Sequence, residues 1–375
     1  MFLKKISPKS FNVFQFIKSS YHMTNLSSPK MQIQINNLLD DLNSEISNIP
    51  NDIKDYLLNK PSIFDNVIKY TFDQKGKLLR PFLTCLMSGT VNAHTNLIQI
   101  SNSNSLEYSK RKLNEHIQKS QYKIAMISEM IHIGSLVHDD IFDNANLRRG
   151  KNSVFHEFDT STATFSGSFI ITKSSSLLST INNPDVIIVL AQVLEDLVTG
   201  ELLQLNQISD DDIRFQSYLK KTYLKTASLM SNSCKAVAIL SDCDAILQLA
   251  AANFGKHLGI AFQLIDDVLD FEVDEKALGK PSMGADLKTG VITGPILFAA
   301  FQHEEINKII TRNFNHKDDV NTVLKLIRES DAIGQTRLLA EFHFKAAMRY
   351  LSYFKDSTFK HALIQYSEKF VHRTS

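Results

Sequence analysis

Six aspartates form two clusters with the same internal spacing, i, i+1 and i+4: Asp139, Asp140 and Asp143, and then Asp266, Asp267 and Asp270. On an α-helix the first and third members of a cluster lie one turn apart on one face, and the second lies beside them. Three crowded carboxylates at the C-terminal end of a helix repel one another and oppose the helix dipole. A bound cation removes this repulsion, and Mg²⁺ prefers such all-oxygen ligands.

One cluster alone would also fit a solvated helix end. Here the clusters are 127 residues apart, and each follows an apolar segment that should be buried. Two buried triads are difficult to explain by chance. We therefore predict that all six aspartates contribute to a magnesium site, with a cluster of two or three ions.

Basic and polar residues flank both aspartate clusters. Each basic residue alone is more typical of a solvated surface charge, but arginine forks and lysine ammonium groups are also the usual ligands of diphosphate oxygens. Their position beside two metal triads predicts two diphosphate pockets. The basic residues concerned are Lys77 and Arg80, Arg148 and Arg149, Lys225, and Lys280.

The elements that position these residues are predicted to be helices. Apolar residues recur at helical spacing from Met31 onward, and no segment alternates in the manner of a strand. No change in composition marks a linker, so residues 31–375 are predicted to form one large all-α domain. The expected helices cover approximately residues 31–46, 56–87 with an interruption near Gly76, 122–142, 161–180, 184–207, 211–240, 245–271, 292–301, 318–329, 331–354 and 358–372, with a surface loop or frayed helix over 101–120.

The first 30 residues differ from the rest. They contain five lysines, six serines and no acidic residue, with apolar residues between the charges. This composition is typical of a mitochondrial transit peptide, although such peptides are usually rich in arginine and this segment has none. A disordered basic tail is the alternative.

Charge and cysteine content exclude other classes. A formal net charge of +1 argues against a general nucleic-acid-binding protein, which needs a basic excess. Cys85, Cys234 and Cys243 have no spacing that suggests disulfides or zinc, so we expect buried thiols. No apolar run is long enough for a transmembrane helix, which leaves at most peripheral membrane contact.

These motifs together resemble the trans-isoprenyl diphosphate synthases, in particular the long-chain mitochondrial hexaprenyl and decaprenyl diphosphate synthases that make the ubiquinone side chain. The resemblance extends from about residue 55 to the C-terminus. The two aspartate motifs in this order, with Lys-Thr-Ala between them, make it specific. The matching stretches are GKLLRP at 76–81, HIGSLVHDDIFDNANLRRGKNSV at 132–154, GELLQL at 200–205, RFQSYLKKTYLKTASLMSNSCKAVAIL at 214–240, FGKHLGIAFQLIDDVLDF at 254–271, LGKPSMGADLKTG at 278–290 and SDAIGQTRLLA at 330–340.

The resemblance implies a helical bundle of the isoprenoid synthase type around a central cavity, and a mitochondrial homodimer or heteromer. It also implies a head-to-tail prenyl transfer, in which an allylic diphosphate such as farnesyl or geranylgeranyl diphosphate ionises and isopentenyl diphosphate attacks the cation. Asp139, Asp143, Asp266 and Lys225 would be catalytic. Isopentenyl diphosphate would be held by Lys77, Arg80, His132 and Arg149, and the allylic diphosphate by Arg148, Lys225, Thr226, Gln263 and Lys280.

The resemblance also implies that the fourth and fifth residues before Asp139 set where chain growth stops. Ser135 lies one turn back, about 40° from the Asp139 direction, whereas Gly134 points well off that face. Both are small, which predicts an open channel and a long product, and phenylalanine at either position should shorten it. A close helix-packing contact is the alternative reading of these two residues.

One residue departs from the family pattern. Ser168 in Gly167-Ser168-Phe169 replaces the usual aspartate, and we expect a local change in packing around it. Three alternatives to a long-chain synthase stay open. They are a short-chain farnesyl or geranylgeranyl synthase, a non-catalytic subunit of a heteromeric synthase, and a terpene cyclase, although a cyclase normally lacks the second aspartate triad.

Overall fold

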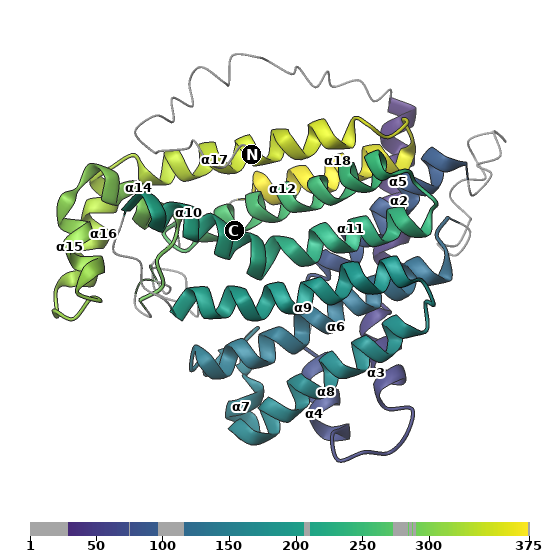
Figure 1. The fold of residues 1–375 in the computed structure, drawn as a ribbon, viewed down its shortest axis with the longest axis horizontal. Helices are drawn as coiled ribbons and strands as arrows, with labels where there is room; N and C mark the ends of the chain where they lie inside the picture. Colours follow the sequence, from purple (N-terminus) through teal and green to yellow (C-terminus); the bar gives the residue numbers. More distant parts are fainter. Residues whose placement is uncertain are drawn as a thin grey trace.

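Long helices packed side by side build the molecule (Figure 1). The computed structural model describes residues 29–74, 76–96, 116–205, 211–272, 284, 287 and 290–373. The first helices among the described residues are α2 (Pro29–Ile46), α3 (Ile49–Leu57), α4 (Asp65–Phe72), α5 (Leu79–Thr95) and α6 (Lys119–Phe142). Then come α7 (Val154–Glu157), α8 (Thr160–Ser179), α9 (Pro184–Leu205), α10 (Asp211–Thr222), the π-helical segment η5 (Tyr223–Ala227) and α11 (Ser228–Leu240). The remaining helices are α12 (Ala245–Leu269), α14 (Gly294–Gln302), α15 (Glu304–Thr311), α16 (Asp319–Glu329), α17 (Ala332–Leu351) and α18 (Thr358–Val371).

The core lies where α5, α6, α11 and α12 meet. These helices are apolar around most of their circumference, because neighbouring helices cover them on several sides. Ile124, Val237 and Phe254 are fully buried. Burying each such side chain contributes about 1.5–3 kcal/mol. The bundle therefore holds α6 and α12, which end in the two aspartate clusters, in fixed relative positions.

The predicted all-α architecture is confirmed, with local departures. The expected continuous helix over 211–240 is instead α10, the π-helical η5 and α11. The short helices α3, α7 and α15 were not predicted, because helices of four to nine residues show little periodicity. A sheet was not expected, yet β1 (Leu147–Arg148) pairs with β2 (Lys151–Asn152) in a two-residue antiparallel hairpin. Its turn needs positive φ at Arg149 and Gly150, which hydrophobic periodicity does not reveal.

Other sequence predictions are tested only in part. The interruption near Gly76 is confirmed, because α4 ends at Phe72 and α5 begins at Leu79. All three cysteines are free and buried. The proposed transit segment falls almost entirely outside the described residues, as does most of the loop predicted over 101–120. Across the described helices, none is both long and apolar enough to cross a membrane.

Candidate active site

A cavity of about 900 Å³ lies among α5, α6, η5, α12 and α18. It brings together most of the residues that the sequence singled out, although they are up to 190 positions apart. Of the predicted residues, Asp140 and Asp270 do not line it, and Lys280 lies outside the described residues. The predicted residues that do line the cavity are Lys77, Arg80, His132, Ser135, Asp139, Asp143, Arg148, Arg149, Lys225, Thr226, Gln263, Asp266 and Asp267.

The first aspartate cluster presents two of its three carboxylates to this cavity. Asp139 and Asp143 lie one turn apart at the end of α6, and both line it. Asp140 lies about 100° away and is buried, where it accepts hydrogen bonds from Arg148, with Nε at 2.8 Å. Burial raises the pKa of Asp139 to about 7, and the nearby Glu201 carboxylate adds to this shift while Lys225 opposes it.

In the second cluster too, one carboxylate faces the cavity and the next is hydrogen-bonded by protein groups. Asp266 faces the cavity at the end of α12, and burial raises its pKa to about 6. Asp267 is almost fully buried and accepts three hydrogen bonds, from Tyr218 Oη at 2.5 Å, Gln263 Nε2 at 3.0 Å and the Gly294 amide at 3.1 Å. Asp270 is the C-cap residue directly after α12, and its backbone carbonyl accepts a hydrogen bond from the Gly284 amide.

The π-helical segment η5 lies beside the two clusters and supplies Lys225 and Thr226. Lys225 Nζ lies 2.7 Å from Glu201 Oε1 and 3.0 Å from Gln204 Oε1, and Thr226 Oγ1 donates to Gln263 Oε1 at 2.8 Å. Single π-turns are frequent at functional sites, because the extra residue turns side chains to new directions. The site therefore has a lysine whose ammonium is fixed close to Asp139.

A second group of cations lies at the start of α5. A Cβ on Gly76 would come within 2.4 Å of the Arg149 guanidinium, so a glycine at this position admits that side chain. Arg80 and His132 lie in the same part of the cavity, and the buried Arg80 Nε has no hydrogen-bond partner among the described residues. Burial and the neighbouring arginines lower the pKa of His132 well below its ordinary value, so the imidazole is neutral. A buried donor without a partner and a surplus of positive charge fit an anionic ligand such as a diphosphate.

The carboxylates fit a divalent cation when water or ligand oxygens complete its coordination shell. In the described ranges, no three His, Cys, Asp or Glu side chains converge closely enough to hold a metal by themselves. Asp139 and Asp143 line the same cavity as Asp266. Mg²⁺ is usually held by one or two carboxylates, with waters and phosphate oxygens completing its shell, and this donor set suits that arrangement.

Several site residues were not identified from the sequence. They are Glu129, Glu201, Tyr218, Lys221 and Arg373. Glu129 lies one turn before His132 and so shares its face, a spacing that could have indicated it. Arg373 had no signal, because it comes from the end of the chain and reaches the cavity only through the packing of α18.

Two further sequence predictions concern the contact between α6 and α8. Ser135 lines the cavity as expected, but Gly134 does not, since a Cβ there would lie 2.8 Å from Ile171 Cγ1 of α8. Gly134 is therefore a helix-packing contact, which favours the alternative reading, and its role in limiting product length stays a prediction. Ser168 is exposed on α8, where its Oγ donates to the Thr164 carbonyl at 2.9 Å and lies 3.5 Å from His138 Nε2.

A helical bundle with two aspartate clusters facing one cation-lined cavity defines a prenyl diphosphate-binding enzyme. The sequence pattern of the polyprenyl synthetase family matches residues 61–327, and the chain belongs to this family. It is a prenyltransferase.

Curated relatives share a large part of the chain. An all trans-polyprenyl-diphosphate synthase of Homo sapiens is 43% identical over 324 residues, which cover 86% of this chain and 74% of the relative. A decaprenyl-diphosphate synthase subunit 1 of Schizosaccharomyces pombe is 36% identical over 345 residues, covering 88% and 90%. The names of these relatives support long-chain trans-polyprenyl diphosphate synthesis.

Solved structures agree with the fold. A heptaprenyl diphosphate synthase from Staphylococcus aureus superposes with a TM-score of 0.76 at 27% identity, covering 89% of this chain and 99% of that one. A polyprenyl synthase from Caulobacter crescentus, complexed with calcium and isoprenyl diphosphate, has a TM-score of 0.74 at 25% identity, covering 91% and 98%. The isoprenoid synthase fold is thereby confirmed.

Proposed function

We propose that this prenyltransferase is a magnesium-dependent trans-polyprenyl diphosphate synthase. It condenses isopentenyl diphosphate head to tail onto an allylic diphosphate such as farnesyl or geranylgeranyl diphosphate. The long-chain product is suited to the ubiquinone side chain. The observation that carries this proposal is that Asp139, Asp143 and Asp266 face one cavity that several lysines and arginines also line.

Two sets of polar and basic residues in this cavity bind one substrate each. Lys225, Thr226 and Gln263 lie near the aspartates and bind the allylic diphosphate, together with Lys280 of the family motif. The group formed by Lys77, Arg80, His132 and Arg149 binds isopentenyl diphosphate. Arg148 already pairs with Asp140, so it would contact the allylic diphosphate only through its remaining donors.

Each residue has a role that follows from its charge. When bound, magnesium ions offset the negative charge that develops on the departing diphosphate. Asp139, Asp143 and Asp266 would hold these ions, while Asp140 and Asp267 fix Arg148, Tyr218 and Gln263 around them. Lys225 donates to the leaving diphosphate, and such a fixed donor contributes most where charge develops in the transition state. Buried walls keep water from the allylic cation until isopentenyl diphosphate attacks it and a proton is lost.

The direct test is an incubation of the full chain with farnesyl diphosphate, labelled isopentenyl diphosphate and Mg²⁺, followed by chromatography of the dephosphorylated products. We expect a ladder that extends well beyond geranylgeranyl length. A product that stops at geranylgeranyl length would keep the chemistry and overturn the long-chain assignment. No incorporation would favour a subunit that needs a different partner chain.

Matched variants separate the site from the fold. Asp139→Asn and Asp266→Asn should each lower kcat by at least about a hundredfold, as the loss of a charge-stabilising group does. Glu304→Gln removes an exposed carboxylate of α15 outside the cavity and should leave kcat unchanged. Near-normal turnover in either aspartate variant would contradict the metal assignment.

We also propose a mitochondrial location, in the matrix with at most peripheral contact with the inner membrane. The acid-free, lysine-rich segment Met1–Lys30 supports import, and one relative is a mitochondrial solanesyl-diphosphate synthase 1 of Oryza sativa. Imaging of the full chain and of a variant without residues 1–30, each fused to a fluorescent protein, tests this. We expect the full chain in mitochondria and the shortened one outside them.

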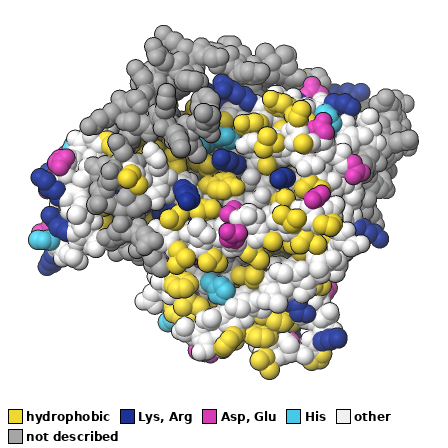
Figure 2. Space-filling view, in the orientation of Figure 1, with side chains coloured by type: hydrophobic (Ala, Val, Ile, Leu, Met, Phe, Trp, Pro, Cys, Tyr) yellow, Lys and Arg dark blue, Asp and Glu magenta, His cyan; other side chains and the backbone are white. Residues whose placement is uncertain are grey.

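Assembly with a second copy of the chain is the third proposal. Ile188, Val198 and Leu202 of α9 are each more than half exposed and lie within about 80° of one another around the helix. Figure 2 shows many hydrophobic side chains over the face on which α8 and α9 lie in Figure 1. Apolar stripes of this kind mark interfaces more often than free surface, and a two-fold pair buries the same patch on both copies.

The mass in solution tests this assembly. By light scattering we expect a dimer for the wild type and a shift towards monomer for Ile188→Glu combined with Val198→Glu. A wild-type monomer would contradict the proposal. A dimer that persists in the double variant would move the interface elsewhere.

A further inference from the structure

Arg373, which follows α18, reaches the part of the cavity that Asp266 lines. Arg373 forms an ion pair with Asp266, and its NH2 also lies 3.3 Å from the Phe262 carbonyl. Its guanidinium lies 4.3 Å from the centroid of the Phe262 ring, as in a cation–π contact. The side chain is 13% exposed, so the charge is largely removed from water.

This contact differs from the other ion pairs of the aspartate clusters. Arg148 pairs with Asp140, a carboxylate that does not line the cavity. Arg373 instead pairs with Asp266, a carboxylate that lines the cavity and that a cation would need. The Arg373 Nε is buried and has no hydrogen-bond partner in the described structure. Among the described residues, the Nη2 group of Arg373 therefore has partners, whereas its buried Nε–H group has none, and this lowers the stability of the contact.

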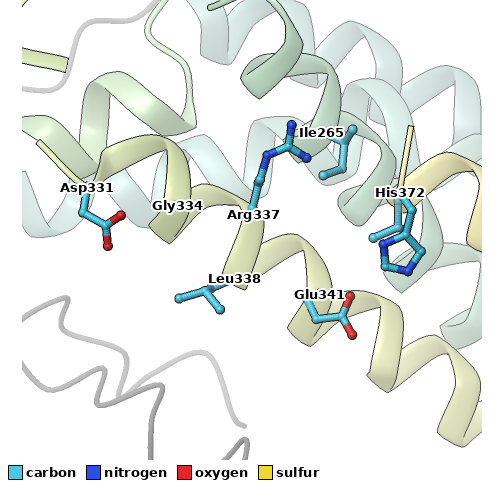
Figure 3. A pocket seen from close by; sticks show the side chains of 8 residues that line it. Ile265, Asp331, Gly334, Arg337, Leu338, Glu341 and His372 are labelled. Carbon is cyan, nitrogen blue, oxygen red and sulfur yellow. The ribbon is translucent and has the colours of Figure 1, made fainter. Parts of the chain in front are cut away.

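The tail that carries Arg373 has an anchored part and a freer part. Val371 is 4% exposed at the end of α18, whereas the next residue, His372, is exposed. A second cavity, of about 410 Å³, lies beside these two residues between α12 and α17. Figure 3 shows His372 at this cavity with Ile265 of α12 and with Arg337 and Glu341 of α17. The residues after Val371 thus have room to move without displacing α17.

We propose that Arg373 is a tethered cation that neutralises Asp266 in the metal-free protein and must leave before a divalent cation binds that carboxylate. The C-terminal tail thereby sets the apparent metal affinity of the second aspartate cluster. This inference rests on the proposed function, in so far as Asp266 is a metal ligand. Competition follows from charge, because a guanidinium and a divalent cation repel each other when both lie against the same carboxylate.

The test measures Mn²⁺ binding to the full chain by electron paramagnetic resonance, without substrate. Arg373→Gln removes the competing charge and should raise the Mn²⁺ affinity about fivefold, the size expected for a partly exposed ion pair. Lys369→Gln is the matched control, since Lys369 also lines the cavity on α18 but has no ion pair with Asp266 in the described contacts. It should change the affinity by less than about twofold, through long-range charge only.

A double-mutant cycle with Asp266→Asn assigns the effect to this carboxylate. In the Asp266→Asn background, Arg373→Gln should leave the affinity unchanged. The inference is overturned if Arg373→Gln binds Mn²⁺ no better than Lys369→Gln, or if its gain persists in the Asp266→Asn background. It is also overturned if neither the wild type nor Arg373→Gln binds Mn²⁺.

Activity separates this inference from the proposed function. If the wild type elongates farnesyl diphosphate with Mg²⁺ while Arg373→Gln has unaltered Mn²⁺ affinity, the proposed function stands and the competition is wrong. If the wild type neither elongates the substrate nor binds Mn²⁺, both fail. Circular dichroism of each variant checks that the bundle is intact.

Discussion

Glu129 shows how burial gives a single residue a role that its position in the sequence does not reveal. Its side chain is 2% exposed, and it lines the cavity together with Arg80 and His132. Burial raises the pKa of Glu129, while the charges of Arg80 and Arg149 lower it. The Glu129 carboxylate therefore lies among the basic residues proposed to bind isopentenyl diphosphate. It balances their positive charge, and it repels a bound diphosphate.

Glu129→Gln should consequently lower the KM for isopentenyl diphosphate several-fold, because glutamine has the same shape and removes the repelling charge. The KM for the allylic substrate should stay constant, since that diphosphate is assigned to the other group of cations. Initial rates with each substrate varied in turn measure both constants. A raised KM for isopentenyl diphosphate would mean instead that Glu129 is needed to orient Arg80, and Glu304→Gln provides the control for charge removal at a distance.

At the scale of elements, the packing of α6 against α8 gives two adjacent small residues different neighbours. Gly134 faces Ile171 and the Gly167 carbonyl of α8, whereas Ser135 faces the cavity. A one-residue step along a helix turns the side chain by about 100°, which is enough to move it from a packed interface to an open channel. Of the two, Ser135 is therefore the better placed to limit the growing chain.

Ser135→Phe should shorten the product while keeping turnover, because the ring would reduce the space beside α6. Gly134→Phe should instead separate α6 from α8 and lower the thermal unfolding midpoint by several degrees or more, as overpacking does. Product chromatography and calorimetry on both variants make the comparison. Shortened product from a stable Gly134→Phe protein would contradict the packing assignment.

At the scale of the whole molecule, a pair formed by the half-buried His257 and the buried His343 joins α12 to α17. His257 Nδ1 and His343 Nδ1 lie 2.9 Å apart, so one ring donates and the other accepts. Burial, together with the nearby Lys256, lowers the pKa of His257 to about 4 and that of His343 to about 3. Both are depressed below the ordinary value of about 6.5, so the unfolded chain binds more protons as the pH falls below that value.

The pair therefore makes the bundle less stable in acid. The stability that it contributes is fully present above about pH 6.5 and is lost as the pH falls towards 4 and then 3. His343→Gln removes one titrating group and should reduce the fall in unfolding midpoint between pH 6.5 and pH 4. His316→Gln, at an exposed histidine, is the control, and equal acid sensitivity in wild type and both variants would show that the pair does not contribute.

Patterns within the sequence are enough to predict the class of chemistry and the helical architecture. Carboxylates at i and i+4 share a helix face through local geometry alone, so the orientation of Asp139 and Asp143 together was predictable. The same reasoning anticipated α6 and α12, whose apolar residues recur at helical spacing. The separation of Ser135 from Gly134 was also implicit in that geometry, although both were assigned to the channel.

Tertiary structure alone decided which polar groups were already bound by protein. Arg148 pairs with Asp140, Asp267 is enclosed by Tyr218 and Gly294, and Arg373 reaches Asp266 across 107 positions of sequence. These partners come from different elements, so their proximity depends on how the chain folds between them and not on a helical period. Side chains that share a helix face follow from short-range geometry, whereas charges that meet across the cavity follow from the burial of the apolar faces that bring the helices together.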